Sequence, residues 1–327
     1  MKQWQRILAV LAASAGLGLM TTASPLASAA DAPKPAVVKK EAAKDLILKG
    51  DAKCTACHDE ADEPKLLSIA VTRHGVKGDP RTPTCTKCHG ESEQHSQHKG
   101  SDKPPAPDRT FGKHTQNSAG ERSGTCLTCH EKDSNRRHWT GSQHDTQDVT
   151  CNSCHKVHAK EDKVRAKATQ AEVCYTCHKN ERAQGRKVST HPLEIGKVTC
   201  SSCHNTHGSA GPKMVKKNTV NETCHTCHAD KRGPFLWEHQ PVMEDCSICH
   251  TPHGSNISPM LKSRPPVMCT ECHDGPHQSS SINGLNMAGK LVNPLTTTGS
   301  GTGARGCMNC HVKVHGTNSP AGAQLLR

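Results

Sequence analysis

Ten copies of the pattern C-x-x-C-H run along this 327-residue chain and use all 20 of its cysteines. Two thiols at this spacing can each form a thioether with a porphyrin vinyl group, and the histidine that follows can bind the iron. Zinc ribbons also use pairs of cysteines, but they do not require a histidine after every second one. The pattern therefore predicts ten covalently bound haem c groups rather than disulfides or zinc.

The residues of these motifs fall into two sets. The cysteines expected to form thioethers are Cys54, Cys57, Cys85, Cys88, Cys126, Cys129, Cys151, Cys154, Cys174, Cys177, Cys200, Cys203, Cys224, Cys227, Cys246, Cys249, Cys269, Cys272, Cys307 and Cys310. The expected proximal iron ligands are His58, His89, His130, His155, His178, His204, His228, His250, His273 and His311.

Histidines outside the motifs supply candidates for the second axial position. Ten of them flank every second motif, one before it and one after it, whereas methionine, the usual alternative ligand, follows no pattern. The sequence thus predicts bis-histidine ligation throughout. The distal ligands would be His74, His95, His144, His158, His191, His207, His239, His253, His277 and His315. Four surplus histidines, His98, His114, His138 and His225, are expected to be solvated or to lie near propionates.

Chain length limits which iron some of these distal histidines can reach. His158, His207 and His253 each lie three residues after a proximal histidine. Three residues span at most about 10 Å, which is too short to pass comfortably around a porphyrin edge. These histidines are therefore expected to bind a neighbouring haem. The upstream histidines could serve either their own haem or an adjacent one; these are His144, His191 and His239.

The composition indicates how such residues must be positioned. Aromatic residues make up 2% and apolar residues 32% of the chain, and its mean hydropathy is −0.70. Such a chain cannot bury enough apolar surface to offset the entropy of ordering, so bound haems must supply the core. Frequent proline and glycine exclude long helices and regular sheet. The expected fold is a multihaem cytochrome c, mostly coil with short helices around ten haems, forming an elongated haem wire.

The N-terminal segment resembles an export signal. Lys2 and Arg6 precede an uncharged apolar stretch, and Ala27, Ser28 and Ala29 form an A-x-A cleavage signature. Residues 1–30 are therefore expected to be a signal peptide cleaved after Ala29 or Ala30. An uncleaved anchor is less favoured, because the stretch is shorter than the ~20 residues of a membrane span. Residues 31–50 would form an N-terminal tether.

The basic charge does not indicate nucleic-acid binding. The formal charge is +12, but ten haems would bring twenty propionate carboxylates, which are natural partners for the lysines and arginines. Aromatic stacking surfaces are also scarce. A multihaem enzyme would need an open coordination position, and here the distal candidates match the haems in number. The sequence therefore favours electron transfer over catalysis.

Several segments are similar to the MtrA/DmsE family of decahaem c-type cytochromes. The resemblance covers the chain from Cys54 onward and is strongest in SSCHNTHGS at 201–209, ADKRGPFLWEHQPV at 229–242, ICHTPHGS at 248–255 and CHVKVHG at 310–316. It implies two pentahaem modules, at 51–190 and 191–327. The family's distal ligands match the ten flanking histidines named above.

The same resemblance implies a location and partners. The family is periplasmic, is associated with the outer membrane, and takes electrons from a periplasmic or inner-membrane cytochrome. It inserts into an MtrB-like β-barrel and passes electrons to an extracellular multihaem cytochrome or to a terminal enzyme of the DMSO-reductase type. Two alternatives remain: a freely diffusing periplasmic shuttle, and, less favoured, a multihaem reductase.

Overall fold

A computed structural model describes residues 51–59, 64–76, 78–273, 307–320 and 322–326. The chain divides into two units, Met1–Ala42 and Ala43–Arg327, and every described residue belongs to the second. The expected signal peptide and tether lie outside the described residues.

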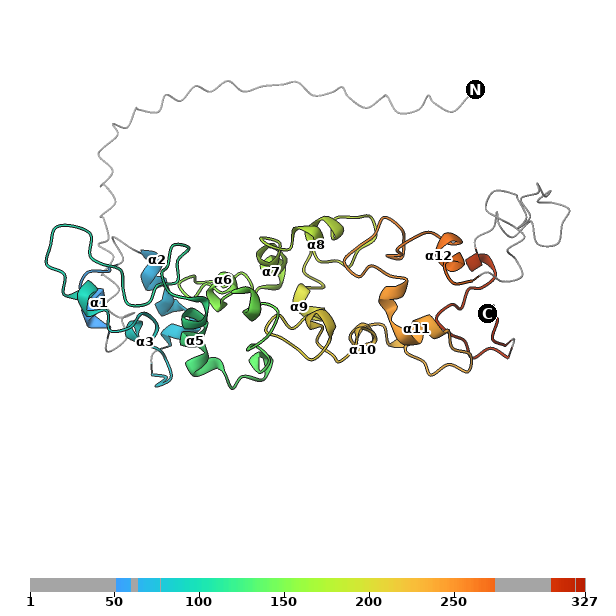
Figure 1. The fold of residues 1–327 in the computed structure, drawn as a ribbon, viewed down its shortest axis with the longest axis horizontal. Coiled ribbons are helices and arrows are strands. Elements are labelled where there is room, and N and C mark those ends of the chain that lie inside the picture. The colour runs from blue at the N-terminus through green and yellow to red at the C-terminus, as the bar shows by residue number, and fades with distance from the viewer. Residues whose placement is uncertain (1–50, 60–63, 77, 274–306, 321, 327) are drawn as a thin grey trace, which may run out of the picture. The chain divides into compact units, whose positions relative to one another are not determined.

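Short helices joined by turns and coil make up the second unit, and their labels follow in chain order in Figure 1. The α-helices are α1 (Ala52–Thr55), α2 (Pro64–Leu67), α3 (Cys85–His89), α4 (Glu93–Ser96), α5 (Ala119–His130), α6 (Cys151–Cys154), α7 (Lys167–Cys174), α8 (Lys179–Gln184), α9 (Cys200–Cys203), α10 (Val220–His225), α11 (Gln240–Glu244) and α12 (Val267–Thr270). The 3₁₀ helices are η2 (Ser68–Val71), η3 (Arg73–Gly75), η4 (Ser134–Arg136), η5 (Asp145–Gln147), η6 (Pro212–Met214), η7 (Ala229–Lys231), η8 (Cys246–Ile248) and η9 (Cys307–Asn309).

Extended pairing is limited to four isolated antiparallel bridges among the described residues, which contain no β-strand. The prediction of coil and short helices with little or no sheet is confirmed. None of the helices in this part of the chain has the length and apolar character needed to cross a membrane.

Helices α6 and α9, which carry the fourth and sixth motifs, are short because each begins at the first cysteine of its motif and ends at the second. Thr150 and Thr199 precede the first cysteine of α6 and α9, and each forms a capping box with the serine three residues later. Such caps satisfy the free N–H groups of a helix start. Both helices end at the second cysteine, and His155 and His204 then take extended backbone angles. The motif histidine thus leaves the helix as a separate projecting side chain.

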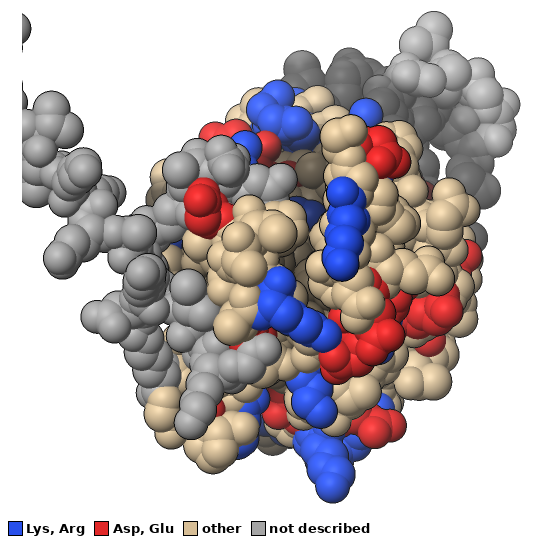
Figure 2. Space-filling view, turned by 90° about the vertical axis from the view of Figure 1, so that its left-hand side faces the viewer, with Lys and Arg blue, Asp and Glu red and all other residues tan. Residues whose placement is uncertain are grey.

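The described residues have almost no apolar core of their own. Trp139, Val215 and Leu261 are the buried apolar side chains, and buried polar residues outnumber them. The interior is instead a continuous cavity of about 4910 Å³ that is lined by the cysteines and histidines of all ten motifs. Figure 2 shows a hollow in the face that lies on the left in Figure 1, with side chains of both charge signs around it.

The first, third, fifth and seventh motifs are each held to the following motif by a polar side chain three or four residues before the first cysteine. The Asp51 carboxylate accepts a hydrogen bond from the backbone N–H of Cys85 at 2.7 Å. Gln170 accepts one from Ser201 N–H at 2.9 Å, and Asn221 accepts one from Cys246 N–H at 2.7 Å. At the third motif the contact differs, because the Ser123 side chain is hydrogen-bonded to the Cys151 thiol and not to a backbone N–H. This repeated contact makes a pair of motifs the building unit of the fold.

Candidate haem-binding sites

The ten C-x-x-C-H motifs define sites 1 to 10, numbered along the chain from Cys54 to Cys307. At every site the N–H of the motif histidine bonds to the carbonyl of the first cysteine, as at His155 (2.9 Å) and His204 (3.0 Å). This turn brings the two thiols and the imidazole to one side of the chain.

Nine motif histidines lie opposite one histidine each from the set that flanks the even-numbered motifs. The ring centroids of these pairs are 5.9–6.3 Å apart. In site order the pairs are His58–His95, His89–His158, His130–His74, His155–His207, His178–His144, His204–His253, His228–His191, His250–His315 and His273–His239. Two imidazoles that bind one metal ion from opposite sides, each nitrogen about 2 Å from it, have ring centres about 6 Å apart.

The pairs join motifs that are distant in sequence. A histidine that precedes an even-numbered motif lies opposite the motif histidine of the next site, as His144 does with His178. A histidine that follows an even-numbered motif from the fourth onward lies opposite the site two motifs earlier, as His207 does with His155. His158, His207 and His253 therefore do not face the motif histidine three residues before them. His95 faces site 1 instead, at the start of the series.

A glycine directly after a distal histidine permits a close approach to the backbone of a segment distant in sequence. Gly208, after His207, has φ +99°, and a β-carbon there would overlap the carbonyl oxygen of His138. Gly254, after His253, has φ +134° and lies equally close to the carbonyl of Gln184. Only glycine adopts such angles without strain.

Nδ1 of most of these rings is anchored, which leaves Nε2 to face the partner ring. His204 donates from Nδ1 to the carbonyl of Lys213 at 3.0 Å, and His250 donates to that of Pro259 at 2.9 Å. His89 and His311 donate to the carbonyls of Arg109 and Gln324. Such contacts fix the tautomer and the orientation of a metal-binding imidazole.

The distal histidines interlock through the same kind of bond. His144 donates from Nδ1 to the Thr206 carbonyl at 2.9 Å, His191 to that of Pro252 at 3.0 Å and His239 to that of Val314 at 3.0 Å. Each acceptor directly precedes another distal histidine. The distal side chains of neighbouring sites 4 and 5, 6 and 7, and 8 and 9 are therefore fixed relative to one another.

Burial keeps several of these imidazoles neutral. Desolvation lowers the pKa of His207 to about 4, and it also lowers the pKa of His74, His89 and His253. An imidazole must be unprotonated at the ligating nitrogen to bind a metal. These side chains are therefore ready to act as ligands at neutral pH.

Cysteine thiols of successive motifs interact and give the order of the sites in space. First cysteines interact between sites 1 and 2, 3 and 4, 5 and 6, 7 and 8, and 9 and 10. Second cysteines lie close enough to interact electrostatically between sites 2 and 3, 4 and 5, 6 and 7, and 8 and 9. A hydrogen bond between thiols raises the pKa of Cys126 and lowers that of Cys151. The ten sites thus follow one another in the order of their motifs.

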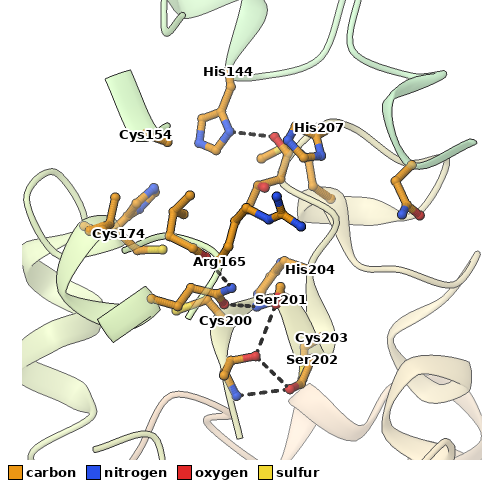
Figure 3. A pocket seen from close by; sticks show the side chains of 18 of the residues that line it. His144, Cys154, Arg165, Cys174, Cys200, Ser201, Ser202, Cys203, His204 and His207 are labelled. Atoms are coloured by element: carbon orange, nitrogen blue, oxygen red, sulfur yellow. Dashed lines mark hydrogen bonds between the residues drawn. The ribbon is translucent and has the colours of Figure 1, made fainter. Parts of the chain in front are cut away.

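Figure 3 shows the part of the cavity around sites 4, 5 and 6. His144 and His207 lie on one side, Cys200 on the other, and the Arg165 side chain extends between them. Trp139 packs against His207 with its ring centroid 6.2 Å away, and its buried Nε1 has no protein partner. Nε2 of His225, which also lines the cavity, is buried without a partner.

These features fit covalently bound haem. A C-x-x-C-H motif supplies two thioether positions, and two facing imidazoles supply the two axial ligands of an iron. Unpaired buried donors such as Trp139 Nε1 need an acceptor, and haem propionates are acceptors. Among the described residues, no three His, Cys, Asp or Glu side chains converge as a metal-binding group, whereas structural zinc takes four ligands.

The remaining predicted residues fall into two groups. His277, the expected distal ligand of site 10, lies outside the described residues. Within the described part, the four surplus histidines face no motif histidine. His98 contacts Asp102 at 3.1 Å and lines the cavity, as His225 does.

Sequence reasoning missed the residues that orient the ligands. Most acceptors of the Nδ1 protons are backbone carbonyls, which leave no trace in the sequence. The carboxylates of Asp133 and Asp162 near two motif histidines could have been noticed from their spacing, as could the polar residues before the odd-numbered motifs.

Comparison with known proteins gives consistent matches. The chain is 42% identical over 295 residues to the multihaem cytochrome MtrA of Shewanella baltica (strain OS185). The aligned residues cover 88% of this chain and 85% of that protein. The chain is 29% identical over 187 residues to the cytochrome c-type protein NrfB of Haemophilus influenzae, covering 51% of this chain and 81% of NrfB. A doubled CXXCH motif model matches residues 191–233 and 239–278, and an NrfB-like cytochrome c model matches 85–171.

Proposed function

The chain belongs to the MtrA/DmsE family of multihaem c-type cytochromes, and from this premise we propose that it conducts electrons across the outer membrane. It takes them from a periplasmic or inner-membrane cytochrome donor. It lies in an MtrB-like porin barrel and delivers the electrons to an extracellular multihaem cytochrome or a DMSO-reductase-type terminal enzyme. Export through the signal peptide places it in the periplasm.

In this proposal all ten sites hold haem c through their two cysteines, with one motif histidine and one distal histidine as axial ligands. The nine facing pairs at 5.9–6.3 Å support this assignment for sites 1 to 9. At site 10 the proposed distal partner of His311 is His277, which lies outside the described residues. When bound, haem supplies a one-electron Fe(III)/Fe(II) couple. Arg165, Trp139 and His225 hold propionates in the cavity.

The observation that carries the proposal is the unbroken series of cysteine interactions from site 1 to site 10, which are hydrogen bonds within each pair of sites and electrostatic interactions between the pairs. Electron transfer between cofactors needs short separations, and motifs close enough for their cysteines to interact would hold neighbouring porphyrins within reach of one another. Residues 51–190 and 191–327 form two five-haem modules, whose adjoining sites 5 and 6 share the Cys174–Cys200 contact. The series offers one path along the whole chain.

We infer that the protein is a carrier and not an enzyme. Substrate chemistry at iron needs an open coordination position. At sites 1 to 9 both axial positions face a histidine, held by Nδ1 bonds such as those of His144 and His204. These bonds oppose the loss of a ligand that substrate binding would demand.

The barrel follows from the chemistry of the surface. Charged side chains of both signs and exposed backbone cannot enter lipid without a large free-energy cost. A closed barrel satisfies its own backbone and can enclose a polar lumen. Insertion into such a partner would therefore let the cytochrome cross the membrane.

Reconstitution tests this proposal. Liposomes that contain the cytochrome with an MtrB-type barrel protein should pass electrons from a membrane-impermeant external donor to an enclosed redox dye. Liposomes with the barrel alone, or with the cytochrome added outside, should pass none. Free cytochrome that matches the complex in reducing a soluble acceptor, without stable binding to the barrel, would support the periplasmic shuttle instead.

A further inference from the structure

The proximal histidines differ in the group that accepts their Nδ1 proton. At sites 2, 6 and 8 the acceptor is a backbone carbonyl. At sites 3, 4 and 5 a carboxylate faces Nδ1 instead: Asp133 at 3.1 Å from His130, Asp162 at 2.6 Å from His155, and Glu181 at 3.8 Å from His178. Three consecutive sites in the series thus have a negative charge behind the proximal ligand.

These three carboxylates are not equivalent. Asp133 also forms an ion pair with Arg136, whose Nη2 lies 3.3 Å from His130 Nδ1, so its charge is shared. Glu181 is too far from His178 for a hydrogen bond. Asp162 makes the shortest contact, its side chain is only 19% exposed, and within the described part of the chain no lysine or arginine is ion-paired with it.

We propose that Asp162 is a positioning residue that lowers the reduction potential of haem site 4 by accepting the Nδ1 proton of His155. This inference rests on the proposed function, since it requires haem at Cys151 and Cys154. A carboxylate acceptor makes the imidazole a stronger electron donor to its metal, and stronger donation favours the ferric state. A short hydrogen bond to an ionised group makes this effect larger than that of a carbonyl.

The distal side of site 4 has the opposite effect on the reduction potential, which the negative charge of Asp162 can offset. Trp139, with 6% exposure, packs against the distal ligand His207 and excludes water from it. A dry environment disfavours the net positive ferric centre and so raises the potential. The Asp162 carboxylate counters this effect from the proximal side.

The position of site 4 gives the effect a consequence for conduction. It lies between sites 3 and 5: Cys151 is hydrogen-bonded to Cys126 of site 3, and Cys154 interacts electrostatically with Cys177 of site 5. Each electron that travels the series must therefore pass this site. Asp162 thus sets the reduction potential of one haem on the electron-transfer path.

Redox titration of the full ten-haem chain, followed by absorbance and EPR, tests the proposal. Asp162→Asn keeps the size and an acceptor oxygen but removes the charge. It should shift one of the ten one-electron steps to higher potential by about 59 mV or more, which is a tenfold change in the ferric-to-ferrous ratio. Asp162→Glu retains the charge and should leave that step within a fraction of this shift.

Two further variants identify the site. Cys151→Ala with Cys154→Ala should remove the step that Asp162→Asn shifts, and adding Asp162→Asn to it should shift nothing more. The Asp133 carboxylate is already paired with Arg136. Asp133→Asn should therefore shift the potential of its step by a smaller amount than Asp162→Asn does. These comparisons separate a local effect on site 4 from a general change in charge.

The possible failures can be told apart. If Asp162→Asn still carries ten low-spin haems by mass and EPR but no step moves, the role of Asp162 is overturned while the proposed function stands. If the wild-type chain lacks a low-spin haem at Cys151 and Cys154, the proposed function fails first. If Asp162→Asn loses haem, the comparison of Asp162→Glu with wild type decides: a shift of tenfold or more despite the retained charge overturns the proposal.

Discussion

The imidazole ring of His207 lies 6.1 Å from that of His155, with the two planes 13° apart, although His207 follows the sixth motif and His155 belongs to the fourth. The motif histidine nearest to His207 in sequence, His204, faces His253 instead. A distal histidine therefore ties together two parts of the chain as well as completing a site.

Replacing His207 by alanine should open the sixth position at site 4 and leave site 6 unchanged. The variant should still carry ten covalent haems, because no thioether cysteine is altered, and EPR of the oxidised protein should show one high-spin haem. Deleting site 4 through Cys151→Ala and Cys154→Ala in the same chain should abolish that signal. A high-spin signal that persists until Cys200 and Cys203 are replaced would contradict the pairing, and His138→Ala serves as the neutral control.

The angle between facing rings predicts the shape of individual EPR signals. The planes of His74 and His130 at site 3 are 88° apart, whereas those of His58 and His95 at site 1 are 4° apart. Perpendicular imidazoles act on different iron d orbitals and leave them nearly equal in energy, which gives a strongly anisotropic low-spin signal. Parallel imidazoles separate these orbitals and give a rhombic signal.

The variant Cys126→Ala with Cys129→Ala should accordingly lose the most anisotropic component of the ferric spectrum. The matched variant at site 1, Cys54→Ala with Cys57→Ala, should lose a rhombic component. Loss of the same component from both would show that the ring orientations are wrong.

Asn221 should be important for stability because it joins sites 7 and 8. It is 9% exposed, donates from Nδ2 to the carbonyls of Val242 at 2.8 Å and Met243 at 3.1 Å, and accepts from Cys246 N–H. Asn221→Ala leaves buried backbone groups unpaired and should lower the free energy of unfolding by about 2 kcal/mol. Guanidinium unfolding followed by haem absorbance measures this, with exposed Asn218→Ala as the control; equal midpoints for the two variants would refute the role.

The sequence was sufficient to predict features that depend on local chemistry. The frequent proline and glycine predicted short helices in place of long ones, and α6 and α9 are four residues long. The scarcity of apolar residues predicted a fold without its own core, and Trp139, Val215 and Leu261 are indeed the buried apolar side chains of the described residues. Chain reach also predicted that His207 does not face His204.

Features that depend on how distant segments dock could not be predicted in this way. The short chain between His204 and His207 excludes His204 as the partner of His207. It does not identify His155 as the partner, because that pairing depends on how the motifs pack together. The Nδ1 acceptors Thr206 and Lys213 act through carbonyls that every residue carries. The order of the sites emerged only from interactions between cysteines of successive motifs, such as the hydrogen bond between Cys174 and Cys200.

The central claim is that the ten sites conduct in series through a barrel. It is tested most directly by removing one middle haem with Cys174→Ala and Cys177→Ala and measuring electron flow to a dye enclosed in liposomes with the barrel partner. His138→Ala provides the matched control with ten haems. The series predicts that the complex still assembles, that the control keeps the full rate, and that loss of site 5 slows transfer by orders of magnitude. Transfer at the full rate without that haem would contradict conduction in series.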